Sequence, residues 1–284
     1  MPNDKINWYP GHMARSRRLL ADQLRAVDAV IELCDARAPM ATRNPDLERL
    51  TREKTRILVL NKADLADDRE TAKWLARLRR GGTTCVRFNS NGGKVKDILG
   101  PIEAASKPAL ERYAARGVRK TIRFMVIGIP NVGKSTFINR LHGSAIAKAG
   151  DRPGVTRANQ WVKIGPFLEL LDTPGMLPPR MDDQEGARLL AYLGSIRDEI
   201  MDTEALAGDL MALLMQIAPD ALRARYKLPE DCDPAPHALL DAACAGRGWL
   251  LGGGRYDTAR AAALVLDEFR AGKIGRISIE RTQE

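Results

Sequence analysis

Residues 123–141 read RFMVIGIPNVGKSTFINRL, an apolar run followed by a glycine-containing loop and a helical pattern. The segment from Gly128 to Ser135 fits GxxxxGK[ST], in the strand, loop and helix context that this pattern requires. Its glycines let backbone N–H groups point at phosphate oxygens, Lys134 brings a positive charge to the β and γ phosphates, and Ser135 ligates Mg²⁺. We therefore predict a nucleotide-binding loop. The residues expected to contact the nucleotide here are Asn131, Val132, Gly133, Lys134, Ser135 and Thr136.

Two later segments supply further candidates for the phosphate end of the site. Asp172-Thr-Pro-Gly175 follows the apolar run LELL, so Asp172 stands at the end of a predicted strand and can join the Mg²⁺ shell, usually through water. Gly175 belongs to a segment expected to move when the γ-phosphate leaves. Thr156, in the loop AGDRPGVTRANQ, is the best candidate for a second hydroxyl on Mg²⁺, with an ordinary turn residue as the alternative.

The base is read elsewhere, since ATP and GTP carry the same phosphates. Asn61-Lys62-Ala-Asp64 closes the apolar run ILVL. The Asp64 carboxylate can accept both N–H donors on the Watson–Crick edge of guanine, an edge that adenine lacks; Asn61 can bond the other side of the ring, and the Lys62 stem can cover its face. Ser90 and Asn91, at the end of another predicted strand, can offer a backbone N–H to the guanine carbonyl. This set of residues is typical of GTPases.

The order of these segments is reversed relative to Ras-like GTPases, because Asn61 precedes Lys134 by 73 residues. A circular permutation explains the order, and a sheet tolerates one because neighbouring strands matter more than how their ends are joined. Apolar, β-branched runs alternate with helical patterns and predict an α/β domain with a mostly parallel sheet. The expected strands cover residues 26–34, 57–60, 85–88, 122–127, 161–164 and 168–171.

The pattern changes to helices alone after about residue 182. Helices are expected over residues 204–216, 236–245 and 258–271, the last one capped by Asp257 and ended by Gly272. We therefore predict a circularly permuted P-loop GTPase domain over residues 1–181 and a small, all-helical domain over residues 182–284. Trp249 and Tyr256 are expected to pack in the core rather than to stack on bases.

Composition excludes several classes of protein. The 284 residues are 44% hydrophobic, which is ordinary for a globular chain and excludes a wholly disordered one. No apolar run approaches the roughly 18 residues that cross a bilayer, and the N-terminus lacks the apolar stretch of a signal peptide. The four cysteines show no CxxC spacing, which argues against a disulfide framework and a zinc site. We expect a cytoplasmic protein that does not enter a membrane.

The positive charge is concentrated in the first two thirds of the chain. The net charge is +9, and residues 1–181 carry 33 basic and 18 acidic side chains, whereas residues 182–246 carry 5 basic and 13 acidic ones. Such an excess is expected where a protein meets phosphate-rich surfaces, although a basic surface can also serve solubility alone. Charge by itself leaves both interpretations open.

Taken together, these segments resemble the family of circularly permuted ribosome biogenesis GTPases of the RbgA/YlqF type. The similarity includes INWYPGHM at residues 6–13, DARAP at 35–39, RNP at 43–45, NKAD, GIPNVGKS, the GVT loop, DTPGM and the C-terminal GRGWLLGGGRYDTARAAALVLDEFRAGKIGRISIE, so it spans essentially the whole chain. The resemblance implies hydrolysis of GTP to GDP and phosphate, coupled to late assembly of the large (50S) ribosomal subunit. The implied partners are rRNA and ribosomal proteins, with the helical domain of residues 182–284 binding RNA or the ribosome and with a monomer off the ribosome.

At the catalytic group, the sequence departs from the pattern of many GTPases. Many GTPases orient the attacking water with a Gln directly after DxxG, but here Met176 follows, and a thioether cannot orient water in that way. The resemblance carries this role onto His12, whose neutral imidazole can orient a water, with a structural or RNA contact as the alternative. It also implies that Asn131 helps to hold K⁺ beside the phosphates, unless Asn131 simply tolerates the loop's turn.

Two other functions stay open at this stage. One is a GTPase that acts on another RNA or on tRNA, which a non-ribosomal RNA complex would favour. The other is a GTP-dependent RNA-binding clamp with negligible turnover, which background hydrolysis in the presence of ribosomal subunits would favour.

Overall fold

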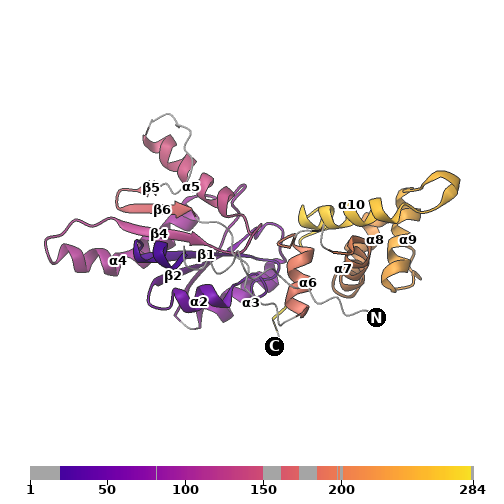
Figure 1. Cartoon of the computed structure of the whole chain (residues 1–284), viewed down its shortest axis with the longest axis horizontal. Helices are drawn as coiled ribbons and strands as arrows, with labels where there is room; N and C mark the ends of the chain where they lie inside the picture. The colour runs from indigo at the N-terminus through magenta and orange to yellow at the C-terminus, as the bar shows by residue number, and fades with distance from the viewer. Residues whose placement is uncertain are drawn as a thin grey trace.

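The structure is a computed structural model that describes residues 20–80, 82–149, 161–172, 184–196, 198 and 201–282. It has two parts, a β-sheet with flanking helices at one end of the molecule and a group of helices at the other (Figure 1). The phosphate-binding loop and the Asn61 segment both belong to the sheet part. The helical part therefore bears on the site through its contacts with that sheet.

The sheet has six strands in the spatial order β3-β2-β1-β4-β6-β5. All neighbouring pairs are parallel except β5 and β6, which pair antiparallel at one edge. This confirms the predicted, mostly parallel sheet. The strands are β1 (Ala29–Asp35), β2 (Thr55–Asn61), β3 (Thr84–Arg87), β4 (Ile122–Ile127), β5 (Trp161–Gly165) and β6 (Leu168–Asp172).

Burial on both faces explains why the central strands read as continuous apolar runs, whereas the edge strands β3 and β5 each bury one residue. Every residue of β1 is buried, as expected for a central parallel strand. Within the strand, the buried Glu32 is neutralised by Arg43 and Arg56. Helices that follow the strands cover the sheet, and a helical segment at residues 20–25 places Leu20 and Leu24 in the core. The helices in this part are α2 (Pro45–Leu50), α3 (Asp68–Arg79), α4 (Lys96–Ala114) and α5 (Lys134–Ala149).

In the second part, the described residues form the three helices that the sequence predicts and two that it does not. The helices are α6 (Gln184–Tyr192), α7 (Thr203–Ile217), α8 (Pro219–Tyr226), α9 (Pro236–Arg247) and α10 (Thr258–Arg270). As predicted, Asp257 caps α10, and Gly272 follows it with φ +72°. The short α8 shows no helical repeat of apolar residues in the sequence, because it buries only Leu222 and Tyr226.

The loop before α10 departs from one expectation. Trp249 is buried, and its ring meets the Tyr226 ring edge-on, as core packing predicts. Tyr256, however, is 43% exposed beside the exposed Leu250 and Leu251. The prediction of core packing for Tyr256 is therefore wrong, because a Leu250–Tyr256 bridge holds this turn at the surface.

The last segment of the chain returns to the sheet part. After α10, the backbone N–H groups of Ile279 and Glu280 both donate to the Arg37 carbonyl, and Trp74 Nε1 donates to the Glu280 carbonyl at 3.1 Å. Figure 1 shows this end of the chain beside α3. The domain division at residues 181 and 182 stays a prediction. Among the described residues, no helix has both the length and the apolar character needed to cross a membrane.

Candidate nucleotide-binding site

The phosphate-binding loop joins β4 to α5, as the sequence predicts. Asn131 has φ +63° and Gly133 has φ +93°, both in the left-handed region. A Cβ atom on Gly133 would lie 2.5 Å from Asn61 Nδ2, so only glycine lets these two segments approach so closely. The permuted halves of the chain therefore meet at this point.

Asn61 joins three segments that are far apart in the sequence. Its Nδ2 donates to the Val132 carbonyl at 2.8 Å. Its Oδ1 accepts from Ser90 N at 3.1 Å and from Ser90 Oγ at 2.7 Å. Asn61 is only 1% exposed, so these bonds are shielded from water. The base-reading loops and the phosphate loop are thus held together by one amide, and a bond from Asn61 to the base itself stays a prediction.

Lys62 and Asp64 follow Asn61 at the carboxyl end of β2. Lys62 has φ +57°, and its Nζ donates to the Asn131 carbonyl at 2.6 Å and lies 3.1 Å from Asp35 Oδ2. The Lys62 side chain therefore crosses toward the phosphate loop. Asp64 and Asn91 are both exposed, so their polar groups can reach a ligand. These positions suit the predicted recognition of guanine.

Asp35 lies at the end of β1, directly opposite Asn61, and is the charged support for Lys62. Burial opposes the charged form of this carboxyl, but the attraction of Arg37 and Lys62 and the hydrogen bonds from Arg37 outweigh burial. The pKa of Asp35 therefore lies well below its usual range. Asp35 stays ionised and keeps Lys62 in place at neutral pH.

Arg37 connects this support to the helical part, a role that the sequence did not reveal. Its guanidinium is 1% exposed and bonds both oxygens of Asp35, at 2.9 and 2.8 Å. Its third nitrogen donates to the Phe269 and Arg270 carbonyls at the end of α10. In the sequence, the DARAP segment indicates only the family resemblance. The pattern that could have predicted this ion pair is an Asp and an Arg two residues apart, directly after a buried strand.

The phosphate side is formed by the start of α5 and the end of β6. Lys134 is 8% exposed, and its Nζ donates to the Ile129 carbonyl at 2.8 Å, within the loop itself. Ser135 and Thr136 are exposed on the first turn of α5. Asp172 is the last residue of β6 and pairs with Val126 of β4, so its backbone ends at the same edge of the sheet as the phosphate loop. His12, Thr156 and Gly175 lie outside the described residues.

The segment after α6 closes against the phosphate loop. Asn131 Nδ2 donates to the Gly194 carbonyl, and Ser195 Oγ donates to the Pro130 carbonyl at 3.0 Å. A cavity of about 480 Å³ lies here, at the carboxyl ends of the strands. The residues that line it are Lys62, Asn131, Leu193, Gly194, Ile196, Asp198 and Arg270.

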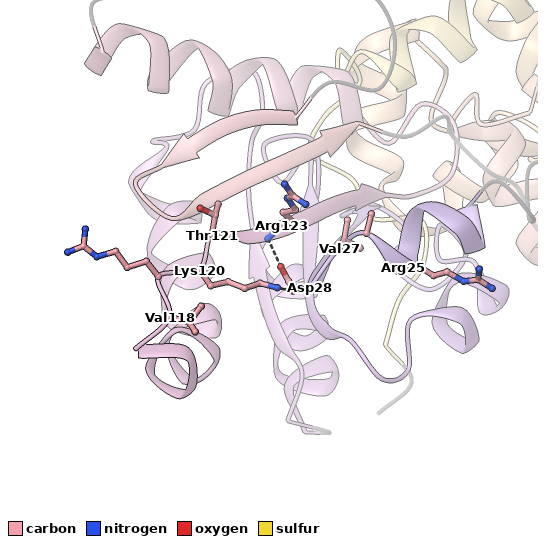
Figure 2. Close-up of a pocket in the computed structure, with 9 residues that line it drawn as sticks. Arg25, Val27, Asp28, Val118, Lys120, Thr121 and Arg123 are labelled. Carbon is pink, nitrogen blue, oxygen red and sulfur yellow. Dashed lines mark hydrogen bonds and ion pairs between the residues drawn. The ribbon is translucent and has the colours of Figure 1, made fainter. Parts of the chain in front are cut away.

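A second cavity, of about 430 Å³, lies at the opposite, amino-terminal ends of β1 and β4 (Figure 2). Two of its cations form ion pairs with neighbouring acids: Lys120 Nζ lies 2.6 Å from Asp28 Oδ1, and Arg123 Nε lies 3.3 Å from Glu169 Oε2. Ligands of open parallel sheets bind outside the carboxyl ends of the strands. The cavity beside Lys62 and Asn131 lies at this carboxyl edge and borders the predicted nucleotide site at those two residues.

Comparison with known proteins agrees with this geometry. A family model described as 50S ribosome-binding GTPase matches residues 123–220. Ribosome biogenesis GTPase A from Bacillus cereus is 43% identical to this chain, over 98% of this chain and 95% of that protein. The chain belongs to the ribosome biogenesis GTPase A family.

Other relatives of the ribosome biogenesis GTPase A family extend the likeness. Mitochondrial ribosome-associated GTPase 1 from Mus musculus is 33% identical, over 98% of this chain and 91% of that protein. A solved structure of GNP-bound YlqF from T. maritima is 27% identical and covers 94% of this chain and 98% of its own, with a TM-score of 0.68. A GDP-bound structure of YlqF gives the same score at 28% identity. The predicted family and the predicted P-loop GTPase fold with a helical C-terminal part are both confirmed.

Proposed function

We propose that this chain binds GTP between the Asn61–Asp64 segment and the phosphate loop and hydrolyses it during assembly of the large (50S) ribosomal subunit. The observation that carries the proposal is the bonding of one Asn61 amide to Val132 and to Ser90, which brings base-reading and phosphate-binding segments into one site. The family model's description names the 50S ribosome, and two related structures are described as GDP-bound and GNP-bound.

Within this site, the residues divide by the part of GTP that they meet. Asp64 accepts the two N–H donors of guanine, and Lys62 covers the ring. A backbone N–H at Ser90 or Asn91 meets the guanine carbonyl, in place of its bond to Asn61 Oδ1 or Asn89 Oδ1. Lys134 leaves the Ile129 carbonyl and bonds the β and γ phosphates, where a charge-assisted bond is stronger. Backbone N–H groups of residues 131–136 surround the phosphates.

The phosphate end also fits cations. Hydroxyl, carboxylate and water oxygens are the preferred ligands of Mg²⁺, and the exposed Ser135 supplies one at the start of α5. We assign Ser135, Thr156 and Asp172 to Mg²⁺, and Asn131 to K⁺. Once bound, these cations neutralise charge on the phosphate oxygens. His12 orients the water that attacks the γ-phosphate, and Gly175 lies in the segment that responds when this phosphate leaves.

We place this activity in the cytoplasm. The chain is a monomer when it is off the ribosome, and its partners are rRNA and ribosomal proteins. The excess of 15 positive charges over residues 1–181 supports contact with rRNA phosphates.

The substitution Asp64→Asn tests guanine recognition. An Asn side chain can accept from N1–H but donates where guanine also donates, whereas xanthine has a carbonyl at that position. Losing a bond to a charged group corresponds to about 1.5–3 kcal/mol, so GDP affinity is expected to fall about 10- to 100-fold and XDP affinity to rise. Titration with fluorescent nucleotides measures both affinities.

Asp97→Asn is the matched control, because Asp97 is an exposed acid on the first turn of α4 and is not among the residues assigned to GTP. It should leave both affinities unchanged. Equal GDP binding by wild type and Asp64→Asn, or wild-type ADP binding as tight as GDP binding, would contradict the proposal.

Turnover tests the catalytic assignments. GTP hydrolysis should be slow for the free protein and faster with large subunits present, and faster in K⁺ than in Na⁺. His12→Ala should lower turnover about 10²- to 10⁴-fold while GTP binding is retained. Unchanged turnover in this variant would assign His12 to structure.

A further inference from the structure

We infer that the C-terminal tail, residues 276–282, positions the base-reading loop for guanine and that Arg276 is the main positioning residue. The base-reading loop is defined here as residues 61–67. This inference rests on the proposed role of Asp64 as the residue that accepts from guanine. It concerns a segment that lies more than 200 residues away from that loop in the sequence.

The tail bonds the backbone on both sides of Asp64. Arg276 NH2 donates to the Ala63 carbonyl at 3.1 Å, and Arg276 Nε donates to the Ala66 carbonyl at 3.2 Å. Between these contacts, the Ile277 backbone N–H donates to the Leu65 carbonyl at 3.1 Å. A planar guanidinium can hold two carbonyls in a fixed geometry, which an ammonium cannot. The position of Asp64 is therefore set from the tail.

The start of α3 is held by the same segment. Ser278 Oγ accepts from the Asp67 backbone N–H at 3.1 Å, and Ser278 is 2% exposed. Arg276 NH1 also lies 2.8 Å from Asp68 Oδ2. In addition, a Cβ on Gly272 would meet Leu65 Cδ2 at 2.7 Å, so the turn after α10 lies directly against the loop. The loop is thus bounded by the tail along its length.

The tail is itself firmly attached to the sheet part. Ile277 and Ile279 are 6% and 7% exposed and belong to the main hydrophobic core. The Glu280 carboxylate accepts from the Met40 N–H at 2.6 Å and from the Ala41 N–H at 3.2 Å. The Thr282 N–H donates to the Glu70 carboxylate. A segment with these anchors can act as a fixed support.

Residues 63–66 of the base-reading loop are held through backbone N–H groups by the sheet part and through carbonyls by the tail. The Ala63 N–H donates to the Phe88 carbonyl, and the Leu65 N–H donates to the Lys62 carbonyl. The carbonyls of Ala63, Leu65 and Ala66 accept from the tail instead. Binding groups have to be held within about 0.5 Å of the geometry that binds the ligand. Losing the tail contacts should therefore let Asp64 move away from the position that bonds guanine.

The test compares GDP with IDP, whose base lacks the 2-amino group that Asp64 is proposed to bond. For each variant, nucleotide titration gives the dissociation constant of IDP divided by that of GDP. In Arg276→Ala this ratio should fall about 3- to 10-fold, corresponding to about 0.7–1.4 kcal/mol. Ser278→Ala should also lower the ratio. Thermal unfolding of each variant verifies that it is folded at the titration temperature.

Arg281→Ala is the matched control, since Arg281 is an exposed arginine of the same tail that donates to the Ile217 carbonyl at the end of α7. Its ratio should equal that of wild type. Arg276→Lys keeps a charge beside Asp68 but cannot hold both carbonyls, so it should behave like Arg276→Ala. A wild-type ratio in Arg276→Lys would assign the effect to the ion pair and overturn the inference.

A purely structural role predicts a different result, because partial unfolding lowers GDP and IDP binding equally. An unchanged ratio in Arg276→Ala and Ser278→Ala would overturn the inference. If Asp64→Asn shifts binding from GDP to XDP in the same series, the proposed function stands and only the positioning role fails. If Asp64→Asn leaves GDP binding intact, the proposed function itself fails.

Discussion

At the scale of single residues, the site depends on charges held where water is excluded. Asp35 and Arg37 are each 1% exposed, and breaking such a pair leaves an uncompensated buried charge. Replacing Asp35 by Asn should therefore lower the free energy of unfolding at pH 7 by about 3–5 kcal/mol. The pair is a support for Lys62 as well as for the fold, so a change here reaches the base-reading loop.

The pKa of Asp35 also predicts how stability depends on pH. Its carboxyl has a lowered pKa in the folded chain and an ordinary value of 3.8 when unfolded, so the unfolded state binds more protons in acid. The stability that Asp35 contributes is complete above about pH 5 and is lost as the pH falls through the folded pKa. Urea unfolding from pH 7 to pH 3 should show this loss in wild type, and a shallower one in Asp35→Asn. Parallel curves would contradict the assignment.

Gly133 provides a test of how the two halves of the site meet. In Gly133→Ala the new methyl would displace Asn61 Nδ2 and strain a backbone with φ +93°. GDP affinity should fall at least about tenfold, as expected when a buried amide loses a partner. Gly143→Ala, in α5 with nothing within 4 Å of its Cβ, should bind GDP normally and gain about 0.5–1 kcal/mol of stability. Equal GDP binding in both variants would contradict this account.

At the scale of elements, α10 connects the helical part to both sides of the site. Its last carbonyls accept from Arg37, and the Arg270 side chain returns to the Ala191 and Tyr192 carbonyls at the end of α6. Arg270 also bonds both oxygens of Asp198, at 2.6 and 2.7 Å. Since Gly194 and Ser195 touch the phosphate loop, α10 holds the segment that closes this loop.

Arg270→Ala is therefore expected to loosen the segment after α6. Amide hydrogen exchange at residues 193–196 should become about 10-fold faster or more, which corresponds to about 1.4 kcal/mol of lost local stability. Arg260→Ala is the control, because Arg260 is exposed on the first turn of the same helix. Unchanged exchange in Arg270→Ala would show that the phosphate loop alone holds this segment.

At the scale of the whole molecule, the uneven charge governs the proposed contact with the ribosome. Residues 1–181 carry the excess of basic side chains, and counterion release makes such contacts weaken with salt. With K⁺ held constant, raising NaCl from 50 to 200 mM should lower affinity for purified large subunits by about 10²-fold or more. Sedimentation with subunits measures the affinity, and GDP binding measured alone is the control. An affinity for subunits that does not change with NaCl concentration would exclude phosphate contacts as the main source of binding.

The strands and the motifs that follow them could be predicted from the sequence alone. Six apolar runs became six strands, because buried strand residues leave an apolar pattern that is visible locally, and it is continuous where a central strand is covered on both faces. NKAD, the phosphate loop and Asp172 each directly follow one of these apolar runs, so they could be placed at the carboxyl ends of strands. Their reversed order was explained by permutation, because parallel strands bring their carboxyl ends to one edge wherever they stand in the chain.

Only the tertiary structure decided which polar groups hold these motifs in place. The bonds from Arg37 to the end of α10, and from Arg276 to the loop around Asp64, join residues more than 200 positions apart. Hydrophobic periodicity records the face that each element buries, but not the path by which the chain's end returns to its beginning. Hydrogen bonds to backbone carbonyls leave even less trace, since every residue carries the same carbonyl group.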